Sequence, residues 1–208
     1  MGFLLAVQGA ASQGILWGIM ALGVFITFKV LDFPDLTVDG SFALGGAVGS
    51  VLVCMNIDPL IALLAAFIAG SLAGAVTALL HTKLKIPGIL AGILTMIALY
   101  SVNIRIMGKP NISLLGVTTL MSRVAELTGA DKTLSSLISG VSFSAAIIAL
   151  LYWFFGTELG SAIRATGTNE YMIRAQGVNT ENMKLIGLAL SNGLTALSGA
   201  LVAQSQGY

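Results

Sequence analysis

The stretch Leu31-Asp-Phe-Pro-Asp-Leu-Thr-Val-Asp-Gly-Ser41 separates two uncharged hydrophobic stretches, residues 14–28 and 41–55. Each hydrophobic stretch holds about 15 residues, which extend about 22 Å as a helix, whereas the hydrocarbon core of a bilayer is about 30 Å thick. The polar stretch is therefore either a surface turn between two short helices or irregular backbone within the membrane. Irregular backbone at membrane depth is tolerated only where protein buries it or water reaches it.

The composition assigns the chain to the integral membrane proteins. Of its 208 residues, 56% are hydrophobic and only 9% are charged, and the mean hydropathy is +0.95. Soluble domains usually carry about 25% charged residues, and so few charges cannot form a water-soluble surface. The formal net charge of +1 gives no argument for nucleic-acid binding. The single cysteine, Cys54, excludes an internal disulfide and is expected to be a small buried hydrophobe.

Hydrophobic runs predict an all-α fold, a polytopic transmembrane helix bundle of about six spans with a broken segment between spans one and two. The predicted spans are residues 14–30, 41–55, 60–80, 87–103, 134–155 and 183–203. Glycine pairs spaced four residues apart recur in four spans, and such pairs let helices approach closely in lipid. These pairs are Gly14/Gly18, Gly45/Gly49, Gly70/Gly74 and Gly88/Gly92. Residues 105–132 form a long loop, in which the apolar run 112–121 is a candidate for partial re-entry.

Alternation of six spans divides the basic residues between the two sides of the membrane. One side receives Lys29, Lys83, Lys85, Arg164, Arg174 and Lys184, and the other receives Arg105, Lys109, Arg123 and Lys132. The positive-inside rule favours the first, larger set as cytoplasmic, which places the N-terminus outside. Residues 1–13 lack the basic start of a signal peptide, so a cleaved leader is not expected.

The polar stretch between spans five and six carries the signals of two short helices. Residues 160–166 can form a helix that stops at Gly167, and Thr168 or Asn169 can cap a second helix that ends at Gly177. This second helix would expose three apolar side chains: Tyr171, Met172 and Ile173. An ordered, capped helix with an apolar tip indicates a docking element, and the alternative is a loop that lies flat on the membrane surface.

The same stretch contains Gly160-Ser-Ala-Ile-Arg164-Ala165, then Asn169, then Ala175-Gln-Gly177-Val178-Asn179. This pattern resembles the cytoplasmic coupling region of importer permeases of the ATP-binding-cassette (ABC) type, in the branched-chain amino acid and ribose permease superfamily. The segments 21–42, 80–86, 92–96 and 191–199 resemble a subgroup of amino-acid permeases for which tryptophan or tyrosine is suggested. The resemblance covers nearly the whole chain.

The resemblance implies a non-enzymatic permease subunit that forms the translocation pathway for an amino acid or similar small solute, in the plasma or inner membrane. It implies a permease homodimer, a cytoplasmic ATPase subunit and an extracytoplasmic solute-binding protein as partners, with the lipid bilayer around them. No cofactor, metal or nucleic acid is expected. In the family further spans follow a Gln-Ser-Gln-Gly segment, whereas this chain stops at Gln204-Ser-Gln-Gly-Tyr208. We therefore expect a single transmembrane domain, residues 1–208, that is incomplete at its C-terminus.

The coupling region, residues 157–182, is expected to pass movements of the ATPase to the spans, because a short capped helix in a groove moves as a body. Its candidate residues are Gly160, Arg164, Ala165, Asn169, Tyr171, Met172, Arg174, Ala175, Gly177 and Asn179. Asn169 would cap the second helix, and Tyr171 and Met172 would enter the groove of the ATPase. Arg164 would either pair with an acidic residue of the ATPase or bind a lipid phosphate.

Polar groups within spans usually face the bundle interior or water, so they are candidates for lining the pathway. The candidates are Asp32, Pro34, Asp35, Thr37, Asp39, Ser41, Thr95, Asn103, Asn192 and Thr195. The alternative for each is a local hydrogen bond between helices. Since no histidine or second acidic cluster joins the three aspartates, we expect them to fix the start of span two near Lys29, with Asp39 as its N-cap and Asp35 capping a turn. The resemblance places this stretch near the bundle centre, which favours a broken segment over a surface turn.

Two other classes of protein fit parts of the sequence. An ion-coupled secondary transporter would use intramembrane carboxylates and a broken helix, which residues 31–41 could supply. Such a transporter does not need a capped docking helix. A membrane scaffold would need only the glycine-rich packing.

Overall fold

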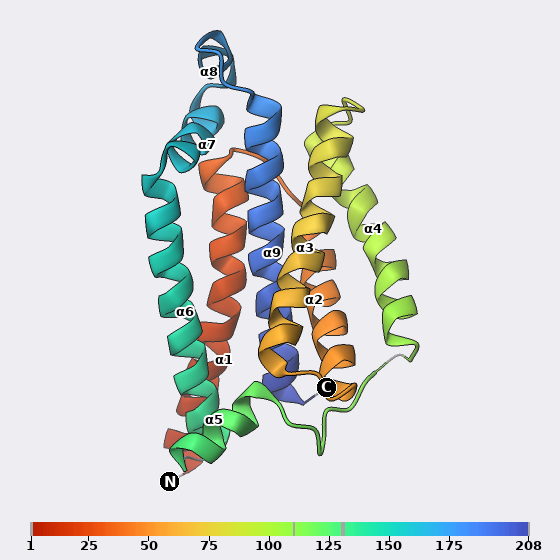
Figure 1. The fold of residues 1–208 in the computed structure, drawn as a ribbon, viewed down its shortest axis with the longest axis vertical. Coiled ribbons are helices and arrows are strands. Elements are labelled where there is room, and N and C mark those ends of the chain that lie inside the picture. The colour runs from red at the N-terminus through yellow and green to blue at the C-terminus, as the bar shows by residue number, and fades with distance from the viewer. Residues whose placement is uncertain (1, 110, 130–131, 208) are drawn as a thin grey trace.

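The computed structural model describes residues 2–109, 111–129 and 132–207 as a bundle of helices (Figure 1), and no strand occurs among these residues. Six helices are long and apolar enough to cross a membrane. They are α1 (Gly2–Phe25) with its π-helical continuation η1 (Ile26–Val30), α2 (Thr37–Cys54), α3 (Pro59–Thr82), α4 (Gly88–Met107), α6 (Lys132–Gly156) and α9 (Thr180–Gln206). The short helices are α5 (Leu120–Thr128), α7 (Glu158–Thr168) and α8 (Glu170–Ala175). The predicted all-α bundle of about six spans is confirmed.

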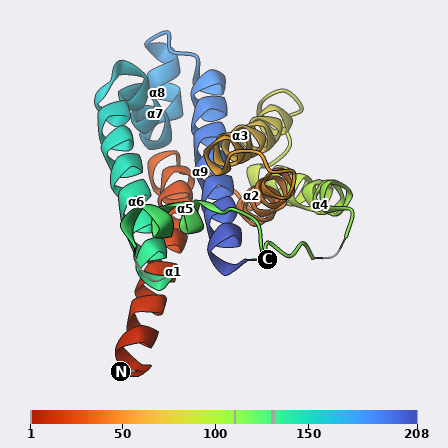
Figure 2. The same ribbon diagram turned by 60° about the horizontal axis from the view of Figure 1, so that its bottom comes forward.

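Helix α9 is the central element of the described chain. In the turned view of Figure 2 it lies between α1 and α6 on one side and α2, α3 and α4 on the other. It contacts α1, α2 and α3 directly, and 72% of its most apolar window is buried. A span that other spans enclose in this way can transmit a displacement to most of the bundle.

Small residues allow α2 and α3 to approach α9. A Cβ added at Gly45 of α2 would collide with the carbonyl of Ala196, and one at Gly74 of α3 would collide with the carbonyl of Leu188. The predicted role of the pairs Gly45/Gly49 and Gly70/Gly74 in helix packing is therefore confirmed. For Gly14 and Gly18 the prediction is wrong, because nothing lies within 4 Å of a Cβ added at either position.

We expect Gly45→Ala to lower the thermal unfolding midpoint of the protein in detergent, whereas Gly18→Ala leaves it unchanged or slightly raised. The first substitution forces α2 away from α9, and overpacking of this kind costs about 1–3 kcal/mol. The second adds a methyl group in open space on a helix, where alanine is the better helix former. Equal midpoints for the two variants would contradict the close packing of α2 on α9.

The break between the first two spans is real and buried. Residues 31–36 have no regular structure, and their side chains alternate between buried and exposed. Phe33 packs against the ring of His81, with centroids 5.0 Å apart, and against Gly88 of α4. Asp35 is only 1% exposed, which excludes a surface turn at this residue. The glycine pair of α4 therefore packs on this irregular segment and not on a helix.

Helix α2 begins in the middle of the bundle, at Thr37, and not at Ser41 as predicted. Its first turn lies beside Asn192 of α9. Asn192 is twelve residues from Thr180, the first residue of α9, so it lies about 18 Å from that end of the helix. The helix starts four residues earlier than expected because the carboxylate of Asp35 accepts the hydrogen bond of the Thr37 N–H at 2.8 Å. Polarity alone could not reveal this start.

The connection between α4 and α6 covers one end of the bundle (Figure 1). Leu114 packs with Val53 and Ala62, and its N–H donates to the carbonyl of Gly207. The predicted re-entry of residues 112–121 into a bilayer stays a prediction, since this segment lies against helix ends. Cys54, expected to be buried, is exposed at the same end because α2 stops there.

The two predicted sets of basic residues lie at opposite ends of the bundle. Lys83 and Lys85 pair with Glu181 at the end that carries α7 and α8, whereas Arg123 pairs with Asp58 at the other end. The separation agrees with the predicted topology.

Candidate functional site

Asn192 of α9 holds the start of α2 through two buried hydrogen bonds. Its Nδ2 donates to Asp35 Oδ2 at 2.7 Å, and its Oδ1 accepts from Ser41 Oγ at 2.6 Å. Asp35 is 1% exposed, and Ser41 and Asn192 are fully buried. The second carboxylate oxygen of Asp35 takes the Thr37 N–H, so a single acid links the break, α2 and α9. A carboxylate is stabilised at this place by charge-assisted hydrogen bonds and by the N-terminus of α2.

A row of three threonine hydroxyls continues this network into α3 and α4. Thr37 Oγ1 lies 2.8 Å from Thr77 Oγ1, Thr77 donates to Thr95 at 2.9 Å, and Thr95 can donate onward to the carbonyl of Ala91. With Thr77 and Thr95 both donating, the Thr37 hydroxyl donates as well, and every hydroxyl is satisfied. The network thus joins α2, α3, α4 and α9 around one buried carboxylate.

Five of the ten predicted pathway residues meet in this network: Asp35, Thr37, Ser41, Thr95 and Asn192. Thr77 belongs to it but was not predicted. Its only sequence signal is a hydroxyl in an apolar span, and Ser71 in the same span carries the same signal. The contact with Thr37 depends on the approach of α3 to the break.

The three aspartates do not form a cluster. Asp35 is buried, whereas Asp32 and Asp39 are exposed. Asp39 lies in the first turn of α2 and does not cap it, so its predicted N-cap role is wrong: Asp35 takes the Thr37 N–H in its place. Within the described ranges, no group of three metal-ligating side chains occurs, and no ion pair joins Lys29 to the aspartates.

The remaining predicted pathway residues lie elsewhere. Asp39 and Asn103 line a groove of about 350 Å³ between α2 and α4, where Asn103 Nδ2 donates to the carbonyl of Gly40 at 3.3 Å. Asp32 and Pro34 line a separate cavity of about 450 Å³ that reaches α7 and α8. Thr195 donates to the carbonyl of Ser191, one turn earlier in α9, so its hydroxyl is satisfied within its own helix and not by the bond between helices named above as the alternative.

The coupling region forms the two predicted helices, but the first, α7, is longer at both ends than the predicted range 160–166, since it runs from Glu158 to Thr168. Asn169 caps α8, since its Oδ1 accepts the Met172 N–H at 3.0 Å, and Gly177 follows α8 with a φ of +87°. Both features were predicted. Helix α7, however, continues through Gly167 to Thr168. Gly167 does not stop the helix but faces the backbone of Val30 and Leu31, where a Cβ would collide.

Helix α8 lies at one end of the molecule (Figure 1), and two large side chains on it are exposed. Tyr171 is 87% exposed and Met172 is 57% exposed, as predicted. Ile173 is only 9% exposed, so its predicted exposure is wrong: its position on this two-turn helix faces the interior.

The other coupling candidates are placed around α8. Gly160 lies against the backbone of Phe154 and Phe155, and the carbonyl of Ala165 accepts the Asn169 N–H. Arg174 and Ala175 are exposed on α8. Asn179 caps α9, because its Oδ1 accepts the N–H groups of Glu181 and Asn182. Arg164 is exposed on α7, away from the tip of α8, beside helices α1 and α6.

Glu170 ties α8 to the first turns of α9. Its carboxylate accepts from Lys184 Nζ at 2.7 Å, from Thr180 Oγ1 at 3.1 Å and from Arg174 at 3.4 Å. Burial alone would raise the pKa of Glu170, but the hydrogen bond and charge of Lys184, together with Thr180 and Arg174, lower it below its ordinary value. Glu170 was not predicted as a site residue, because two of its partners, Thr180 and Lys184, reach it only through the turn between α8 and α9.

We expect the junction of α8 and α9 to loosen as the pH falls below about 4.5. The folded-state pKa of Glu170 is lowered, so its stabilising contribution is present above the unfolded pKa and is lost as the pH falls through the folded one. Protection factors from hydrogen exchange of residues 170–184 at pH 7 and pH 3 measure this change, because they are corrected for the pH dependence of intrinsic exchange. Glu170→Gln should show low protection factors at both pH values, and Glu158→Gln should behave as the parent does. A Glu170→Gln variant that keeps the parent's pH dependence would contradict the assignment.

Comparisons with known proteins now define the family. The sequence profile of the family described as "Branched-chain amino acid transport system / permease component" matches residues 6–208. The chain is 41% identical over 197 residues to the "Tyrosine transport system permease protein" of Clostridioides difficile (strain R20291), covering 95% of this chain and 64% of that protein. It is 37% identical to "Uncharacterized protein RP368" of Rickettsia prowazekii (strain Madrid E), covering 96% and 68%.

A more distant relative is the "Ribose import permease protein RbsC" of Escherichia coli (strain K12), 30% identical over 191 residues, with 88% of this chain and 56% of that protein covered. The chain thus spans between about half and two thirds of the length of these relatives. No solved structure matches it significantly. The chain is a multi-pass membrane protein that belongs to the family of permease components of branched-chain amino acid transport systems.

Proposed function

We propose that this chain forms part of the translocation pathway of an ABC importer for an amino acid or a similar small solute. The observation that carries the proposal is α8, a capped helix that holds Tyr171 and Met172 exposed at the end of the bundle predicted to face the cytoplasm. Large apolar side chains on a short, ordered helix suit insertion into a groove of a partner protein. The names of the tyrosine and ribose transport relatives support an importer of small polar solutes.

The partner in this proposal is a cytoplasmic ATPase subunit, which drives the movement of α8. Helix α8 is bound to α9 through the Glu170 carboxylate and Lys184, whose side chain is only 15% exposed. Two turns further along α9, Asn192 binds Asp35 at the buried start of α2. A displacement of α8 by the ATPase would therefore reach the break in the bundle through a single rigid helix.

Because α2 begins in the bundle interior, its first turn and the groove that contains Asp39 and Asn103 can change exposure when α9 moves. We assign the alternating access of the solute to this region. A second copy of the permease would complete the pathway, and an extracytoplasmic binding protein would deliver the solute.

The test is coexpression of the tagged chain with a candidate ATPase subunit and a candidate binding protein, followed by reconstitution into vesicles. The proposal requires that the ATPase copurify and that uptake depend on ATP. A protein that never associates with an ATPase, and that takes up solute without ATP, would refute it.

One observation favours a second candidate, an ion-coupled secondary transporter. Asp35 is a buried acid beside a helix break, and such acids bind coupling ions in that class of transporter. Uptake that collapses with the ion gradient, and that continues without ATP, would select this candidate.

A further inference from the structure

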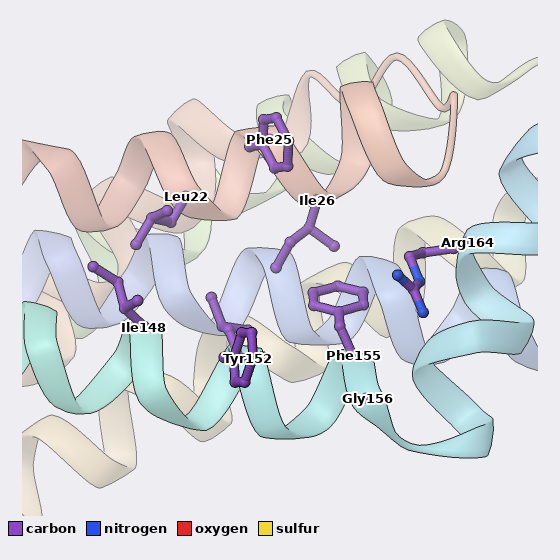
Figure 3. A pocket seen from close by; sticks show the side chains of 9 residues that line it. Leu22, Phe25, Ile26, Ile148, Tyr152, Phe155, Gly156 and Arg164 are labelled. Carbon is purple, nitrogen blue, oxygen red and sulfur yellow. The ribbon is translucent and has the colours of Figure 1, made fainter.

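An apolar groove runs along the outside of the bundle between α1 and α6, and its volume is about 550 Å³. Figure 3 shows side chains of the two helices pointing toward one another across it. Ile26 and Leu151 form its buried floor, at 1% and 8% exposed. Phe25, Ile148 and Tyr152 form its exposed rim. A volume of this size is typical of sites for small organic ligands.

A cation closes one end of this groove. Arg164, on α7, lines the groove and lies past Phe155 in the close view (Figure 3). Within the part of the chain that the structure describes, its guanidinium has no hydrogen bond or ion pair, whereas Arg123 and Arg174 are both paired with carboxylates. An unpaired guanidinium beside an apolar surface suits an anion that carries an apolar chain.

The groove lies at the depth where a lipid would reach it. Both α1 and α6 are membrane spans, and Ile148 and Phe155 lie seven residues apart on α6, about 10 Å along the axis. The aromatic residues 152–155 end α6, and aromatic residues gather where a span meets the headgroups. Arg164 follows at the same end, so acyl chains would meet the groove and phosphates would meet the arginine. Basic pockets between spans on the cytoplasmic side are known to hold anionic lipid headgroups.

We propose that this groove binds an anionic phospholipid, with an acyl chain along Ile26 and Leu151 and the phosphate on Arg164. Of the two partners considered above for Arg164, an acid of the ATPase or a lipid phosphate, this selects the lipid. Helix α8 carries the exposed docking tip, whereas Arg164 faces the spans. The site depends only on the membrane location of the chain and is independent of the proposed transport activity.

Native mass spectrometry of the purified protein, delipidated and then offered phosphatidylglycerol or phosphatidylcholine, tests the proposal. We expect one phosphatidylglycerol to be retained in preference to phosphatidylcholine, and Arg164→Gln to weaken its retention about tenfold because the charge-assisted contacts are lost. Arg164→Lys should retain an intermediate amount. Lys29→Gln, which removes an exposed cation outside the groove, should retain as much lipid as the parent.

A second variant separates the lipid from a free anion. Ile148→Trp fills the groove and leaves Arg164 in place, so it should also lose phosphatidylglycerol, and glycerol phosphate alone should not compete with the lipid. Equal retention of the two lipids, unchanged retention in Arg164→Gln or Ile148→Trp, or displacement of the lipid by glycerol phosphate would overturn the proposal. Loss of ATPase binding in Arg164→Gln with unchanged lipid retention would do so as well, and would assign this arginine to the ATPase.

Discussion

The double variant Tyr171→Asp with Met172→Asp is expected to abolish ATP-driven uptake while leaving the permease folded. Both side chains are exposed at the tip of α8, so carboxylates there are solvated and leave the bundle intact. In the complex the same carboxylates would enter an apolar groove without a partner. Loss of one central apolar anchor costs about 2 kcal/mol or more, and two such losses correspond to a reduction in affinity of over a hundredfold.

The measurements are uptake into vesicles, copurification of the ATPase, and the unfolding midpoint of the isolated permease. Met55→Asp with Leu115→Asp is the matched control, since these side chains are 65% and 84% exposed at the opposite end of the bundle. The control should copurify the ATPase and unfold as the parent does. Normal uptake and copurification in the α8 variant would show that α8 is not the docking element.

The second large effect is expected from substitutions of Asp35 and Asn192, whose side chains join the start of α2 to α9. In Asp35→Asn an amide replaces the carboxylate, and its Nδ2 faces the Asn192 Nδ2, so two donors meet in a buried site. Asn192 cannot simply rotate its amide, because the same Nδ2 also donates to the carbonyl of Leu188 at 3.0 Å. Leaving a buried donor unsatisfied costs about 1–3 kcal/mol.

Asn192→Asp is expected to be worse, because it places two carboxylates in hydrogen-bond contact in the interior. The double variant Asp35→Asn with Asn192→Asp restores one donor and one acceptor, and Ser41 can still donate to residue 192. We expect both single variants to lower uptake and the unfolding midpoint, and the double variant to recover a large part of each. If Asp35→Asn alone behaves as the parent does, the residue acts only as a cap, and its charge has no part in the pathway.

Much of this architecture follows from the sequence because it depends on neighbouring residues. The six spans follow from length and hydropathy, and the caps of α8 follow from Asn169 and Gly177. The broken segment was predicted from two short flanking stretches and from the family resemblance, but only the second flank is short: the first span runs from Ala6 to Val30, 25 residues, whereas α2 has 18. These features are local, and the bundle only stabilises them.

The features that sequence reasoning missed all depend on distant contacts. The sequence predicts that Gly167 ends a helix. In the structure its missing side chain lets α7 pack closely on the backbone of Val30 and Leu31. Nothing in the neighbouring sequence distinguishes Thr77 from the other hydroxyl residues of the spans. It joins the network only because the fold brings Thr37 into hydrogen-bond distance of it. Glu170 acquires its role because the turn after α8 returns the chain to Lys184.

The most direct test of the central claim, that α8 docks on an ATPase, is site-specific photo-crosslinking from Met172. A benzoylphenylalanine at this exposed position would be activated in membranes that contain the permease together with its candidate ATPase, and the crosslinked product would be identified by mass spectrometry. We predict a crosslink between residue 172 and the ATPase subunit, with a yield that changes when ATP is added. A crosslink to lipid alone, or no crosslink to the ATPase in a membrane where both proteins are present, would contradict it.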